Sequence, residues 1–63
     1  MNYTKYLVDA YRPAMDAANK TGLPQTVFYH PDYAFSWVES GSRILRDKQS
    51  KVHVTWLPEG FFQ

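Results

Sequence analysis

The sequence predicts an α+β domain in which one N-terminal amphipathic helix packs on one face of an antiparallel sheet of three or four strands. Three observations indicate this fold class. Apolar residues recur at helical spacing between residues 3 and 18, and a period of two begins after Pro24. Five tyrosines, four phenylalanines and two tryptophans supply a core for a chain without cysteine. Because 63 residues suit one small core, we treat residues 1–63 as a single domain.

The helix is predicted from a single apolar stripe. Its members are Tyr3, Tyr6, Leu7, Ala10, Tyr11, Ala14, Met15 and Ala18. Asn2 or Thr4 is positioned to cap the start, and Gly22 to end the helix in a left-handed turn. Pro13 interrupts the pattern, so the alternatives are one kinked helix and two short helices that meet at Pro13. The stripe continues on both sides of Pro13 and favours one kinked helix.

The remainder of the chain reads mainly as strands. Residues 25–30, 33–39 and 51–57 alternate or are rich in β-branched and aromatic residues. Pro31-Asp32 and Ser40-Gly41-Ser42 are turn signals between them. The segment 43–50 fits either a further strand or a short helix capped by Ser42. A simple meander of four consecutive strands favours the strand.

One helix covers one side of a sheet, so we expect the other side to be open. The face under the helix is predicted to carry Val27, Tyr29, Tyr33, Phe35, Trp37, Val52, Val54 and Trp56. The opposite face would carry Thr26, Phe28, His30, Ala34, Ser36, Val38, Lys51, His53 and Thr55. A mildly apolar open face of this kind is typical of a surface that binds a partner or a second copy of the chain.

Three groups of residues are candidates for such an interface. The full set is Phe28, Val38 and His53 on the open face, Arg43, Arg46, Lys48 and Lys51 in a basic segment, and Phe61 and Phe62 at the C-terminus. The two terminal rings either anchor a partner or fold back on the chain's own core. The basic segment either binds phosphates beside neighbouring rings or keeps a hairpin tip soluble.

The sequence contains few residue patterns typical of catalysis or metal binding. His30-Pro31-Asp32 together with His53 is the one constellation that suggests an acid–base or metal site, and a metal normally needs three or four convergent ligands. The chain has no cysteine, no Gly-x-Ser-x-Gly motif and no phosphate-binding glycine loop. We therefore predict no enzyme, no metal and no cofactor.

The leading functional hypothesis is a small non-enzymatic protein-binding module that acts as a regulator, inhibitor or adaptor of a larger partner. Short single domains of this composition are used by bacteriophages and mobile elements against host proteins, which suggests a viral protein. The alternative is nucleic-acid binding through the basic 43–51 segment and nearby rings, although a net charge of +1 is low for that role. Self-association into a homodimer is a second use of the open face. Without a long apolar run or a signal-like N-terminus, we expect a cytoplasmic location and no membrane contact.

Overall fold

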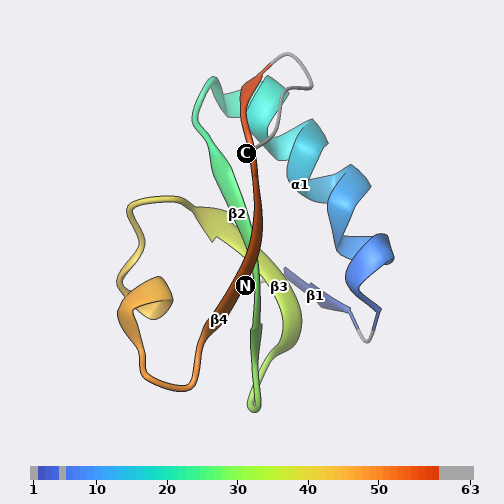
Figure 1. The fold of residues 1–63 in the computed structure, drawn as a ribbon. Helices are drawn as coiled ribbons and strands as arrows, with labels where there is room; N and C mark the ends of the chain where they lie inside the picture. Colours follow the sequence, from blue (N-terminus) through green and yellow to red (C-terminus); the bar gives the residue numbers. More distant parts are fainter. Residues whose placement is uncertain (1, 5, 59–63) are drawn as a thin grey trace.

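The structure is a computed structural model that describes residues 2–4 and 6–58. It contains one α-helix, one short 3₁₀ helix and a four-stranded antiparallel sheet (Figure 1). In chain order the elements are β1 (Asn2–Thr4), α1 (Leu7–Thr21), β2 (Gln25–His30), β3 (Ala34–Glu39), η1 (Arg43–Arg46) and β4 (Lys51–Trp56). The predicted class, one helix packed on an antiparallel sheet, is confirmed.

The strands lie in the order β1-β3-β2-β4, so β2 is central and β1 and β4 form the two edges. β2 and β3 make a hairpin in which Val27 faces Trp37, and β4 returns to the other side of β2. Since β3 and β4 both run antiparallel to β2, they are parallel to each other. Between residues 40 and 50 the chain must therefore travel back along the sheet, which replaces the simple meander expected from the sequence.

The helix approaches the sheet closely because its buried stripe is made of small residues. Ala10, Ala14 and Ala18 are fully buried, and Ala10 and Ala14 share a core cluster with Val27. Partly buried rings and aliphatic side chains surround that cluster: Leu7, Tyr11, Phe35, Trp37, Val54 and Trp56. A single helix runs through Pro13, as the unbroken stripe predicted, and it ends at Gly22 with φ 73°. The Gly22 N–H donates to the Ala18 carbonyl at 2.9 Å.

The start of the helix differs from the prediction. Residues 2–4 form β1, so Tyr3 belongs to a strand, and neither Asn2 nor Thr4 caps the helix. The helix begins at Leu7 after an extended Tyr6. The physical reason is tertiary pairing: β1 runs antiparallel to β3 with Tyr3 opposite Ser36, and this pairing outweighs a local helical period.

The segment 43–50 is not a strand. Residues 43–46 form η1, with the Leu45 N–H donating to the Ser42 carbonyl at 3.2 Å, and a turn follows in which the Ser50 N–H donates to the Asp47 carbonyl at 3.0 Å. The alternative of a short helix after Ser42 is therefore the better description, although the Ser42 side chain makes no capping hydrogen bond. The Ser50 hydroxyl closes the segment on itself by donating to the Ile44 carbonyl at 2.6 Å.

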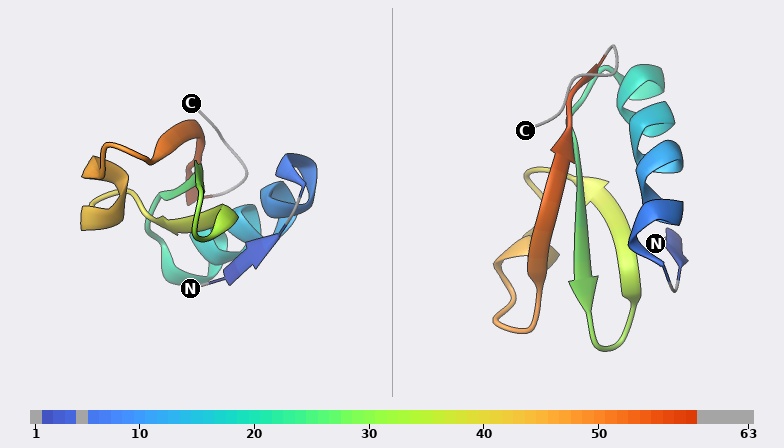
Figure 2. Two further views of the ribbon diagram at one scale, coloured as in Figure 1. Left: turned by 90° about the horizontal axis from the view of Figure 1, so that it is seen from below. Right: turned by 45° about the vertical axis from the view of Figure 1, so that its right-hand side comes forward.

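The 40–50 connection (residues 40–50) lies on the side of the sheet away from α1 (Figure 2, left). The protein thus has a helix on one face of the sheet and an irregular segment over the other. Phe28 and its cross-strand neighbour Ser36 point to this second face, and both are 0% exposed. The prediction that one face of the sheet is open is wrong, because the long return between two parallel strands crosses that face.

Candidate binding groove

The residues expected on an open face are instead part of a second, smaller core. Phe28 is fully buried and Val38 is half-buried, so neither presents the broad surface predicted for them. His30 is also buried, with 3% of its side chain exposed. Sequence periodicity placed Phe28 and Val38 on the correct face. It carried no signal that the 40–50 connection would cover that face.

A bulge in β4 changes which of its side chains face the helix. Val27 pairs with Val54 and Phe28 pairs with Val52, so β4 has one extra residue, His53, at this point. Val52 consequently lies on the side away from α1, whereas the prediction placed it under the helix. His53 moves the other way, and its ring meets Phe35 edge-on at 5.5 Å. Strict alternation could not anticipate the bulge, since nothing in the local composition marks it.

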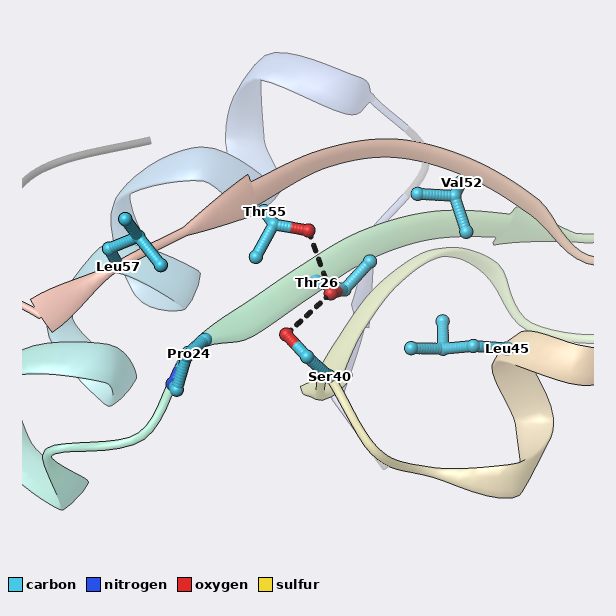
Figure 3. Close-up of a pocket in the computed structure, with 7 residues that line it drawn as sticks. All are labelled: Pro24, Thr26, Ser40, Leu45, Val52, Thr55 and Leu57. Carbon is cyan, nitrogen blue, oxygen red and sulfur yellow. Dashed lines mark hydrogen bonds between the residues drawn. The ribbon is translucent and has the colours of Figure 1, made fainter. Parts of the chain in front are cut away.

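An open groove of about 380 Å³ lies between β4 and the 40–50 connection (Figure 3). Its lining comes from four places in the chain: Pro24 and Thr26 at the start of β2, Ser40 and Leu45 in the connection, Val52 and Thr55 on β4, and Leu57 after it. Figure 3 shows the Val52 and Leu45 side chains directed toward each other across the groove. Val52 is 53% exposed, which is high for an aliphatic side chain in a strand.

The floor of the groove is held by hydroxyl groups. Thr26 Oγ1 lies 2.8 Å from Ser40 Oγ and 3.0 Å from Thr55 Oγ1, and both contacts are hydrogen bonds (Figure 3). These bonds connect β2 to the end of β3 on one side and to β4 on the other. Because Thr26 is nearly fully buried, the network fixes the floor while the apolar side chains form the walls.

Two arginines lie in the element that contributes Leu45 to the groove: Arg43 and Arg46 belong to η1. Lys51 precedes the groove residue Val52 but pairs with Tyr29, so its side chain lies on the helix side of the sheet. Lys48 lies between Arg46 and Lys51 in the chain, and all four cationic residues are exposed. Asp47 is the one acidic residue in the 43–51 segment. Arg43 and Arg46 therefore give the η1 side of an apolar groove a positive charge.

His30 connects the sheet to the 40–50 connection. Its Nδ1 accepts a hydrogen bond from the Asp32 N–H at 3.1 Å, and its Nε2 lies 3.5 Å from Asp47 Oδ2. The ring also packs on Tyr33, with 5.0 Å between ring centroids. Because Nδ1 accepts the Asp32 N–H, Nε2 is the ring nitrogen left to donate toward Asp47. The sequence suggested a chemical role for His30, and the structure shows it buried as an anchor for the connection.

Replacing His30 with alanine should loosen the connection. The change removes a buried ring together with its contacts to Tyr33 and Asp47. We expect a loss of about 2 kcal/mol in the free energy of unfolding. His53→Ala is the matched control: its ring is exposed, so the expected loss is about 0.5 kcal/mol or less. Urea unfolding of both variants measures the difference. Equal losses for the two histidines would contradict the anchoring role.

The environment of Asp47 favours its charged form. The pKa of this carboxyl lies below its ordinary value of 3.8, first because Oδ1 accepts a hydrogen bond from the Gln49 N–H at 2.8 Å, with a smaller contribution from His30. Partial desolvation acts in the opposite sense. Since the native pKa is the lower one, the stabilisation is present above the unfolded-state value and is lost as the pH falls through the native pKa.

The side chains of His30, Asp32 and His53, the one constellation in the sequence that suggests an acid–base or metal site, do not converge. His30 contacts Asp32 and Asp47 on the side of the sheet away from the helix, whereas His53 packs on Phe35, which belongs to the helix side. Within residues 2–4 and 6–58, no group of three or more His, Cys, Asp or Glu side chains is placed to hold a metal ion. No helix in the same part of the chain is long and apolar enough to cross a membrane.

One cluster of rings and the two arginines of η1 lie on different sides of the sheet. Tyr29, Phe35 and His53 form this cluster on the helix side, with ring centroids 5.1 Å apart for Tyr29 and Phe35 and 5.5 Å apart for Phe35 and His53. Arg43 and Arg46 belong to η1, on the opposite side of the sheet. The arginines are therefore separated from this cluster, whereas Lys51, which pairs with Tyr29, lies on the same side as the cluster. Phe61 and Phe62, predicted to contact a partner, lie outside the described residues.

Comparisons with known proteins give no relative: no protein-family model, no curated protein and no solved structure matches this chain.

Proposed function

We propose that this protein is a small non-enzymatic binding module that acts as a regulator, inhibitor or adaptor of a larger protein partner through the groove beside β4. The observation that carries the proposal is the exposure of an apolar wall next to an edge strand. Val52 is 53% exposed, and it lines a groove with Pro24, Leu45 and Leu57. Apolar surface of this kind, bordered by polar and charged side chains, is typical of protein contact sites.

The geometry changes the contact surface proposed from the sequence. Phe28 is unavailable because it is buried, and Val52, which the sequence placed under the helix, takes its place. Arg43, Arg46, Lys48 and Lys51 remain candidates because all four are exposed, and the two arginines belong to η1 beside the groove. A cytoplasmic location and a viral or mobile-element source stay predictions from the sequence, and the proposed contact does not depend on them.

The nucleic-acid alternative has less support, because Arg43 and Arg46 lie on the side of the sheet opposite the cluster of Tyr29, Phe35 and His53. Of the basic segment, Lys51 lies on the side of these rings. The two functions differ in their response to salt. Phosphate contacts weaken steeply as salt rises because counterions are released on binding. A partner held mainly by apolar contacts in the groove should be retained at the same salt concentrations.

Affinity capture from source-cell lysate with paired variants tests the proposal. Val52→Glu places a charge in the groove, whereas Val8→Glu places the same charge on the outer surface of α1, where Val8 is 69% exposed. We expect a protein captured by wild type and by Val8→Glu to be lost with Val52→Glu, at least tenfold in bound amount. A charge buried against an apolar wall costs far more than one left in water. Equal capture by both variants would remove the groove from the interface.

A further inference from the structure

We infer that β4 and its groove bind an extended segment of the partner that is rich in acidic residues and adds to the sheet as a further strand. This inference rests on the proposed function and specifies the partner chemistry at the same surface. Three independent features of the described residues carry it: a free strand edge, an adjacent side-chain pocket and a one-sided charge distribution.

The first feature is the strand edge. β4 is the last strand in the order β1-β3-β2-β4, and it has six residues, whereas the opposite edge strand β1 has three. Between residues 51 and 55, the outer side of β4 pairs with no other strand among residues 2–4 and 6–58. Unpaired N–H and C=O groups along an edge can accept an added strand through main-chain hydrogen bonds.

The second feature is the pocket beside that edge. Val52 and Thr55 from β4 line the groove together with Leu45 from η1 (Figure 3). The bulge at His53 is what directs Val52 to this side, and bulges commonly redirect a side chain in this way. An added strand directs alternate side chains to the same face, so an apolar side chain of the partner can enter the groove while the next one points away.

The third feature is charge. Arg43 and Arg46 lie in η1 beside the groove, Lys51 lies on the edge strand β4, and the segment 43–51 carries these three cations and Lys48 against Asp47 alone. Asp47 already faces His30. β4 itself contains no acidic residue. A second copy pairing through its own β4 would supply no carboxylate and would bring another Lys51 to the interface. An acidic partner segment complements the cations that a second copy would repel.

Selection from a library of random linear peptides displayed on phage tests the inference without assuming a sequence. The immobilised proteins are wild type, Val52→Glu and the double charge reversal Arg43→Glu/Arg46→Glu. We expect wild type to enrich peptides in which apolar residues alternate with polar ones and acidic residues are over-represented. The best peptide should bind at least tenfold more weakly to each variant, because one variant places a charge in the groove and the other reverses the charge of η1.

Amide hydrogen exchange then locates the selected peptide. Strand addition should slow exchange at amides of residues 51–55 when the peptide is added, while exchange in α1 is unchanged. Enrichment of basic peptides, enrichment of nothing, or binding that leaves the β4 amides unprotected would each overturn the inference. Tighter binding to a single-stranded oligonucleotide, or β4 protection that grows with protein concentration in the absence of peptide, would overturn it as well. The last result would assign the edge to a second copy.

Different results would disprove the inference and the proposed function. If Val52→Glu loses the captured protein but no acidic peptide is selected, the groove binds a partner and only the extended acidic mode is wrong. If an acidic peptide binds along β4 but Val52→Glu captures as well as wild type, the captured protein uses another surface. Thermal unfolding followed by circular dichroism confirms that each variant is folded before either result is interpreted.

Discussion

Phe28→Ala is expected to unfold most of the protein at 25 °C. Phe28 is the largest fully buried side chain, and truncation of a buried phenylalanine typically costs about 3–5 kcal/mol. A domain of this size has only about 3–5 kcal/mol of stability to lose when no disulfide or metal supports it. Circular dichroism and urea unfolding measure the outcome directly.

Val52→Ala is the matched comparison on the same face. Val52 is the cross-strand neighbour of Phe28 but is 53% exposed, so its truncation should cost about 0.5–1 kcal/mol. A Phe28→Ala variant that unfolds at the same urea concentration as Val52→Ala would mean that the 40–50 connection does not cover Phe28. The sequence alone placed Phe28 on an open face, and the structure reverses that expectation.

The elements that could be predicted are those whose pattern is local. The alanines at 10, 14 and 18 repeat every four residues, and Gly22 follows them at the point where a left-handed turn ends the helix. The strands at 25–30 and 51–56 were found from β-branched and aromatic residues, with ends that differ from the prediction by at most one residue. In each case neighbouring residues in the sequence decide the structure.

The features that sequence reasoning missed depend on distant partners. β1 forms because β3 offers a free edge to Tyr3, and η1 forms because the chain must return along the sheet before β4 begins. The bulge at His53 adjusts the register of β4 against β2. The return of the chain and the bulge together moved the candidate surface from Phe28 to Val52. The cations of the basic segment were identified correctly as exposed, but their position beside a groove required the fold.

Cysteine labelling compares two positions on the face away from the helix. The natural chain contains no cysteine, so Ser36→Cys and Val52→Cys each introduce a single thiol. Ser36 is 0% exposed, and its hydroxyl donates to the Tyr33 carbonyl at 3.0 Å; serine to cysteine is a small change in size. Val52 stands in the open groove. Urea unfolding of both variants establishes that the native state is the one being labelled.

The rate of native-state thiol labelling at these two positions tests most directly whether the 40–50 connection closes the second face and leaves only the groove beside β4 accessible. We expect the thiol of Val52→Cys to react nearly as fast as an unfolded thiol. The thiol of Ser36→Cys should react at roughly a hundredth of that rate or at a lower rate, because it becomes accessible only when the fold opens. Similar native rates at both positions would show an uncovered sheet face and contradict the account.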